Sequence, residues 1–154
     1  MKSLLMIKKS EFPIGFEMLT IATALDLVLF GFEMSHNDGT TSYFGLHTNC
    51  PWKLLNGSEI VVGSEDRDKI EIDGKLKYTF THLFNNLINN SKSIIILDVE
   101  MNLDGSLFIA LSHGYNLFIG VYNSKASETE LWRLINKTTR EHFVAYSGMT
   151  FLLT

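Results

Sequence analysis

Residues 94–122 read IIILDVEMNLDGSLFIALSHGYNLFIGVY, and this stretch decides the fold class of the 154-residue chain. Three apolar runs are separated by Asp104-Gly105 and His113-Gly114, pairs that tolerate the backbone of a tight hairpin turn. In the second run Leu107, Ile109 and Leu111 alternate with Phe108, Ala110 and Ser112. In the third run Tyr115, Leu117, Ile119 and Val121 fall on one face of the strand. Alternation of this kind is typical of strands with one buried face. The stretch therefore predicts an antiparallel meander of three strands, the first over residues 94–102.

The segment before the meander has the period of an amphipathic helix. Its apolar residues follow the spacing i, i+3, i+4, i+7 and i+8: Phe80, Leu83, Phe84, Leu87 and Ile88. This spacing places all of them on one helix face, which we expect to be buried against the sheet. Thr79 is expected to be the N-cap, and Asn89-Asn90 to end the helix.

Other segments predict further strands. Residues 27–34 and 41–47 flank His36-Asn37-Asp38-Gly39 and predict a hairpin, residues 59–62 predict a strand, and residues 131–135 and 142–146 predict a last hairpin. Residues 127–130 also fit a capping box, which leaves a short helix open as the alternative near Trp132. No repeat or linker divides the chain. We expect a single domain over residues 1–154 of the α+β class, an antiparallel β-sheet of meander and hairpins with one main amphipathic helix packed on it.

Composition excludes several classes of protein. Apolar residues make up 45% of the chain and charged residues 19%, which argues against intrinsic disorder. The net charge is −4 and the basic residues are scattered, so we expect no nucleic-acid partner. Segment 13–34 is apolar but contains Glu17, Asp26 and Glu33, which argues against a membrane span and favours a strand pair in a soluble core. The single cysteine, Cys50, cannot form an internal disulfide; with no signal peptide visible, this predicts a cytoplasmic protein.

The densest group of chemically informative residues is His47-Thr48-Asn49-Cys50-Pro51-Trp52-Lys53. Cys50 could be a nucleophile with His47 as its base, because a thiolate needs a neighbouring base or cation at neutral pH. Alternatively, Cys50 and Trp52 are buried core residues. Asp66 lies in a charged loop, 63–69, that has neither the calcium-binding nor the phosphate-binding glycine pattern. Paired Cys/His motifs are absent from the sequence, so we expect neither a metal nor a cofactor.

The chain ends in the apolar segment 149–154. Such a tail is expected to pack either on its own domain or on a neighbouring molecule. An open sheet also leaves two edge strands unpaired, and twofold pairing would cover an edge and the tail together. We therefore predict a homodimer, with folding of the tail onto its own core as the alternative.

Four segments carry a resemblance to a known family: residues 47–53, 63–66, 111–117 and 132–134. Over residues 25–147 the chain resembles a family of small bacterial proteins with a His-x-x-Cys-Pro-Trp-Arg-like segment, a Gly-Ser-x-Asp segment and a late Trp-Arg. Lys53 stands where that family usually has Arg. The family has no established activity, so the resemblance implies no catalytic roles. We take its motif residues as candidates for a binding site: His47, Cys50, Trp52, Lys53, Asp66, Trp132 and Arg133.

Two functional hypotheses follow. The first is a non-catalytic protein-binding module, which by analogy could be an immunity protein that neutralises a toxin-like partner. The second is a small thiol- or metal-dependent enzyme that uses Cys50, His47 and Asp66. The exposure of Cys50 separates them, because a reactive thiol must lie in an accessible cleft.

Overall fold

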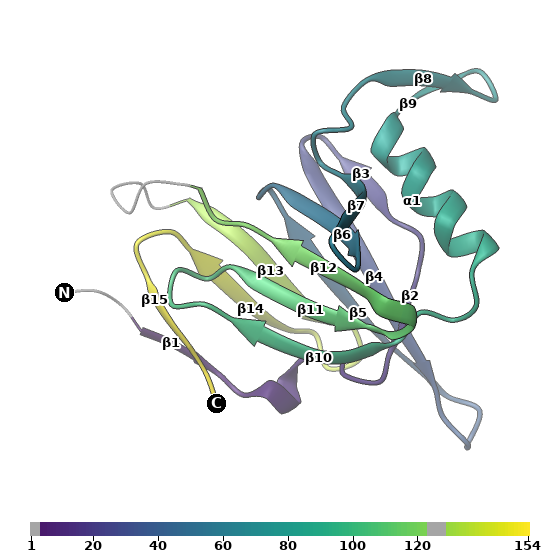
Figure 1. Ribbon diagram of the computed structural model, residues 1–154. Coiled ribbons are helices and arrows are strands. Elements are labelled where there is room, and N and C mark those ends of the chain that lie inside the picture. Colours follow the sequence, from purple (N-terminus) through teal and green to yellow (C-terminus); the bar gives the residue numbers. More distant parts are fainter. Residues whose placement is uncertain (1–3, 123–128) are drawn as a thin grey trace.

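Two antiparallel sheets form the body of the computed structural model, which describes residues 4–122 and 129–154 (Figure 1). The larger sheet has the order β14-β13-β5-β4-β2, with β3 paired to the beginning of β4. Its strands are β2 (Glu17–Met18), β3 (Ala22–Ala24), β4 (Leu27–Ser35), β5 (Thr41–Thr48), β13 (Glu130–Asn136) and β14 (Glu141–Tyr146). The smaller sheet has the order β10-β11-β12-β6-β7. Its strands are β6 (Trp52–Asn56), β7 (Glu59–Gly63), β10 (Ile96–Met101), β11 (Leu107–Leu111) and β12 (Tyr115–Ile119).

The two sheets are joined at one side and enclose a common core. At the junction of β2 with the start of β10, Met18 N donates to Ile94 O (2.8 Å) and Ile96 N donates to Phe16 O (2.9 Å). The chain also passes directly from β5 in the larger sheet to β6 in the smaller one. The core between the sheets is built from the inward-facing positions of both: Phe30, Phe32, Leu46 and Leu134 from one, and Leu54, Leu107, Ile109, Leu117 and Ile119 from the other.

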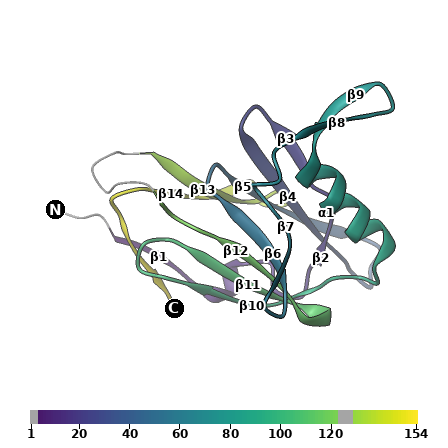
Figure 2. The same cartoon turned by 45° about the horizontal axis from the view of Figure 1, so that its top comes forward.

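The helix α1 (Thr79–Asn90) and the hairpin of β8 (Lys69–Ile72) and β9 (Lys75–Tyr78) lie at one end of the molecule, opposite the chain termini (Figures 1 and 2). The buried residues of α1 are Phe80 and Phe84. Phe84 packs edge-on against Phe30 and Trp52, with ring centroids 5.8 and 5.9 Å apart. The helix bounds agree with the sequence prediction.

Two details of the helix prediction are wrong. Leu83 is 39% exposed, while Leu87 and Ile88 are only half-buried, because the apolar stripe is wider than the surface it contacts. Thr79 is the first helical residue and not the N-cap, which is Tyr78. The first helical N–H groups are instead satisfied by loop carbonyls, since Thr79 N donates to Asp68 O (2.7 Å) and Phe80 N donates to Asp66 O (2.9 Å).

The apolar tail forms β15 (Thr150–Leu153), which pairs in parallel with β1 (Leu4–Ile7). Phe151 is 1% exposed, and its ring lies 6.4 Å from that of Trp132. Phe151 N also donates to Leu103 O (3.2 Å), in the turn between β10 and β11. The tail therefore packs on its own chain, as in the alternative set out above.

The predicted α+β class is confirmed, with sheets that are mostly antiparallel and a helix packed on them. The meander is present as β10, β11 and β12, although β10 begins two residues later than expected. The hairpins β4–β5 and β13–β14 are present, and Trp132 lies in a strand. Ser127 and Glu128 of the alternative capping box lie outside the described residues. Within residues 4–122 and 129–154, no helix is long and apolar enough to cross a bilayer.

Candidate functional site

The connection between β5 and β6 is fixed by hydrogen bonds to the start of β13. The Thr48 hydroxyl donates to Leu131 O (3.2 Å) and accepts from Cys50 N (2.9 Å). The Cys50 thiol also donates to Leu131 O (3.4 Å). Cys50 is buried, and burial raises the pKa of its thiol, partly offset by the hydrogen bond from Thr48. The thiol is therefore held protonated, which is the opposite of what a nucleophile needs.

His47 faces away from this connection, on the outer face of the larger sheet. Thr48 next to it is buried, and Arg133 lies directly opposite His47 on β13. Burial lowers the pKa of His47, and the positive charges of Lys137 and Arg133 lower it further. Arg133 is held by Glu130, to which its Nε donates at 2.8 Å. The structure thus brings His47 together with Arg133, and no hydrogen bond between described residues joins His47 to Cys50.

Trp52 and the Gly63-Ser64-Glu65-Asp66 segment form one unit. The Ser64 hydroxyl accepts from Trp52 N (2.9 Å) and donates to Trp52 O (3.2 Å). A Cβ at position 63 would lie 3.0 Å from Trp52 O, so glycine allows the two backbones to approach closely. Asp66 stabilises the turn, since its Oδ2 accepts from Gly63 N (2.9 Å). Two of the four sequence motifs therefore meet at Trp52, where the Gly-Ser-x-Asp motif holds the backbone of the Cys-Pro-Trp motif.

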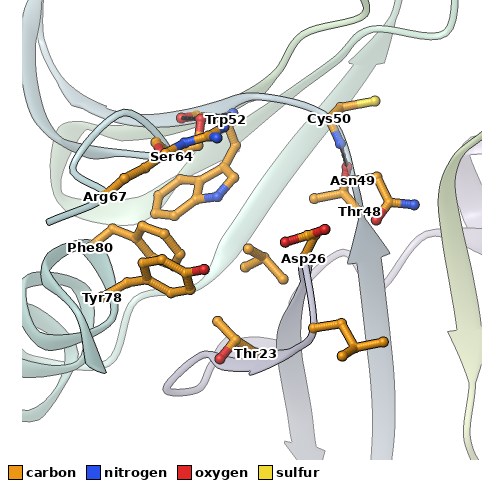
Figure 3. Close-up of a pocket in the computed structure, with 12 residues that line it drawn as sticks. Thr23, Asp26, Thr48, Asn49, Cys50, Trp52, Ser64, Arg67, Tyr78 and Phe80 are labelled. Atoms are coloured by element: carbon orange, nitrogen blue, oxygen red, sulfur yellow. Dashed lines mark hydrogen bonds between the residues drawn. The ribbon is translucent and has the colours of Figure 1, made fainter. Parts of the chain in front are cut away.

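Two cavities flank this unit, and Trp52 and Ser64 contribute to both. One, of about 300 Å³, lies between the β3–β4 turn and β9 and is drawn in Figure 3. The other, of about 430 Å³, opens near the ends of β7 and β12. Residues lining the second cavity, called here the Phe118 groove, are Pro51, Trp52, Lys53, Ile60, Gly63, Ser64, Glu65, Asp66, Phe118 and Tyr122.

The Phe118 groove continues into an apolar strip on the outer face of the smaller sheet. The Lys53 ammonium lies 5.5 Å from the Phe118 ring centroid, within cation–π range. Phe108 packs beside Phe118, with centroids 6.5 Å apart. Ile60 is 59% exposed and Tyr122 is 75% exposed. This arrangement can bind apolar side chains of another molecule.

The remaining candidate, Trp132, belongs to the core. It is fully buried, and its Nε1 donates to Gly105 O (2.8 Å). It therefore offers no surface to a partner. The candidate residues are thus divided among the core, the outer face of the larger sheet and the two cavities.

Sequence reasoning missed Ile60, Phe108, Phe118 and Tyr122. A signal for two of them was present in the predicted meander. Phe108 and Phe118 occupy the strand positions that alternation assigns to the outer face, where apolar residues need an explanation.

Within the described ranges, no three or more His, Cys, Asp or Glu side chains are placed to hold a metal ion together. No protein-family model matches the sequence, and no curated protein or solved structure is significantly similar to it.

Proposed function

We propose that the chain is a non-catalytic protein-binding module and that the Phe118 groove is its binding surface. The observation that carries this proposal is the concentration of exposed apolar side chains beside Lys53. Exposed apolar patches rimmed by polar residues are characteristic of protein interfaces, and aromatic residues with nearby cations often dominate their binding energy.

The charge around the groove indicates the kind of partner. Glu59 is exposed at the start of β7, Glu65 is an exposed lining residue, and the whole chain has a net charge of −4. A partner that inserts an apolar side chain into the groove and places basic groups over its rim would match both features. Complementary charge of this kind speeds association and selects the partner.

The geometry gives less support to a thiol- or metal-dependent enzyme. Cys50 is buried with a raised thiol pKa, His47 lies opposite Arg133 in the larger sheet, and the Asp66 carboxylate accepts a hydrogen bond from Gly63 N. A binding protein requires none of them to react.

The biological role that fits this proposal is a cytoplasmic bacterial immunity protein whose partner is a toxin-like basic protein. In a homodimer, the Phe118 groove would be occupied by a second copy of this chain. The apolar tail no longer argues for that dimer, because Phe151 is buried within the chain. The groove itself is the remaining argument for self-association.

Paired substitutions test the proposal. Ile60→Ser with Tyr122→Ser removes exposed apolar groups from the groove, and Tyr43→Ser with Leu76→Ser removes exposed apolar groups elsewhere. Tagged versions are used to capture proteins from a bacterial lysate, and the affinity of each captured protein is then measured by interferometry. A true partner binds the wild type and the control pair alike and binds the groove pair more than tenfold more weakly, as expected for loss of interface hot spots.

Equal binding by both pairs would show that the groove is not the surface. Light scattering on the same proteins measures whether the chain forms a homodimer through the groove. A dimer that dissociates only in the groove pair identifies the partner as another copy of this chain.

A further inference from the structure

The cavity of Figure 3, called here the Asp26 pocket, is assembled from three separate parts of the chain. Thr23 comes from β3 and Asp26 from the β3–β4 turn, Asn49 from the β5–β6 connection, and Arg67 and Tyr78 from the loop after β7 and the end of β9 (Figure 3). Its volume of about 300 Å³ lies at the lower end of the range for small-molecule sites. The pocket is therefore sized for a single small ligand.

The decisive feature of this pocket is an unused hydrogen-bond donor. Trp52 is 3% exposed, and its Nε1 is the buried side-chain nitrogen or oxygen that lacks a partner among residues 4–122 and 129–154. Leaving such a group unpaired carries a desolvation penalty, and native structures rarely retain one without a reason. Figure 3 shows the indole nitrogen and the Asp26 carboxylate on facing sides of the pocket. An indole N–H only donates, so a ligand there must present an acceptor.

The other polar groups of the lining restrict the ligand further. The Asp26 carboxylate, the Thr23 hydroxyl and the Asn49 side-chain amide are on exposed lining residues, and the Tyr78 hydroxyl also faces the lining; among the described residues none of these groups has a hydrogen-bond partner. A carboxylate only accepts, whereas hydroxyls and amides do both. A ligand that satisfies Trp52 and Asp26 must therefore accept at one point and donate at another. A hydroxyl group does both.

The charge and the apolar part of the lining both favour an uncharged ligand that carries hydroxyl groups. Asp26 and Arg67 are the charged residues of the lining and their formal charges cancel, so the pocket favours an uncharged molecule. The rings of Trp52, Tyr78 and Phe80 also line it. A ring that carries C–H groups on its faces and hydroxyls at its edge matches both the apolar and the polar parts of this lining.

We propose that the Asp26 pocket binds a small neutral polyhydroxylated molecule of monosaccharide size, with a ligand hydroxyl accepting from Trp52 Nε1. This site shares only Trp52 and Ser64 with the Phe118 groove, and it does not require a protein partner.

The two tryptophans of the chain allow a direct test. Protein labelled with ¹⁵N in its indole groups gives two indole N–H signals, and Trp132→Phe identifies the one that belongs to Trp52. The probes are D-glucose, D-ribose, N-acetyl-D-glucosamine and myo-inositol, each added to millimolar concentration, with L-alanine as a charged comparison. At least one polyol is expected to move the Trp52 signal saturably while the Trp132 signal stays in place.

Variants then assign the contacts. Asp26→Ala should weaken binding at least fivefold, and Thr23→Val more modestly, while Glu71→Ala on exposed β8 should bind like the wild type. These substitutions lie on exposed residues, so they keep the test valid if Trp52→Phe itself folds poorly. If no polyol moves the Trp52 signal, or if both indole signals move together, the proposal is overturned. A response to L-alanine alone would show that the ligand is a zwitterion and that the proposed class is wrong.

Discussion

The two tryptophans are both buried, but they lie in different kinds of surroundings. Trp132 has no exposed surface, its Nε1 donates to Gly105 O, and its ring contacts Phe12 and Phe151 at centroid distances of 6.3 and 6.4 Å. Trp52 is 3% exposed and contacts Phe30, Phe80 and Phe84 edge-on, but its Nε1 has no partner among the described residues. Both cavities described above adjoin Trp52.

The comparison shows that burial alone does not separate a structural residue from a site residue. The separating property is the satisfaction of the polar atom. A satisfied indole in a closed core contributes to stability, whereas an unsatisfied one beside a cavity keeps a donor available for a ligand.

Removing the tail should have the largest effect, because it opens the surroundings of Trp132. A chain that ends at Gly148 loses Phe151 and the pairing of β15 with β1. The loss of one buried aromatic side chain alone costs about 3–5 kcal/mol, which is a large part of a typical domain's stability. Urea unfolding of the intact and truncated chains, followed by fluorescence, measures the change.

Light scattering on the intact chain accompanies this measurement. If the truncated chain keeps its stability and only its association state changes, the tail serves a neighbouring molecule and the packing described here is wrong.

Conservative replacement of each tryptophan should reveal the asymmetry between them. Trp132→Phe removes the donor to Gly105 O and leaves a buried carbonyl without a partner, whereas Trp52→Phe removes a donor that has none. We expect Trp132→Phe to lower the free energy of unfolding by about 1–3 kcal/mol more than Trp52→Phe. Matched urea titrations measure both. Equal losses would mean that the indole nitrogen of Trp52 is satisfied in solution.

The fold was largely predictable because its strongest signals are local. The meander combines alternating apolar residues with Asp104-Gly105 and His113-Gly114, where His113, Gly105 and Gly114 all adopt positive φ. The strand β6 was missed because it begins at Trp52, directly after a proline, and its alternation is obscured by Leu54-Leu55. The strand β1 depends on pairing with β15 at the other end of the chain, which no local pattern encodes. The strands β2 and β3 pair with the nearby β4, as expected from the strand pair predicted within residues 13–34.

The site was predictable only in part, because proximity in sequence did not give proximity on one face. His47 and Cys50 are three residues apart, yet His47 pairs with Arg133 across the sheet and Cys50 contacts Leu131. The nearness of Trp52 to Ser64 was not anticipated, although both had been noted as parts of motifs. The Asp26 pocket joins residues from position 23 to position 80, so only the tertiary structure reveals it.

Cys50 lines the Asp26 pocket but should react slowly, which sharpens the distinction between a binding site and a catalytic one. Its thiol is buried and its pKa is raised, so little thiolate forms at neutral pH. We expect labelling by a thiol reagent to be more than tenfold slower in the native state than in urea. Fast stoichiometric labelling of the native protein would favour the enzyme hypothesis instead.

The same raised pKa predicts a dependence on alkaline pH. Above the ordinary pKa of a thiol, the unfolded chain loses the Cys50 proton while the folded chain retains it, so the free energy of unfolding falls as pH rises. Cys50→Ala should remove this contribution. Unfolding titrations of the two proteins across the alkaline range measure the difference, and identical slopes would show that Cys50 does not cause it.

The smallest expected effect comes from His47, on the face of the larger sheet away from both cavities. Burial, with Lys137 and Arg133 nearby, lowers its pKa in the folded state, so the unfolded chain takes up a proton first as the pH falls. Stability should therefore decline as the pH falls below the ordinary pKa of histidine. His47→Gln should flatten this decline, and Lys137→Met should reduce it by removing one of its causes. Urea titrations between mildly acidic and neutral pH measure both variants. A steeper decline in His47→Gln would show that His47 is stabilised in its charged form, which would contradict its placement among Lys137 and Arg133.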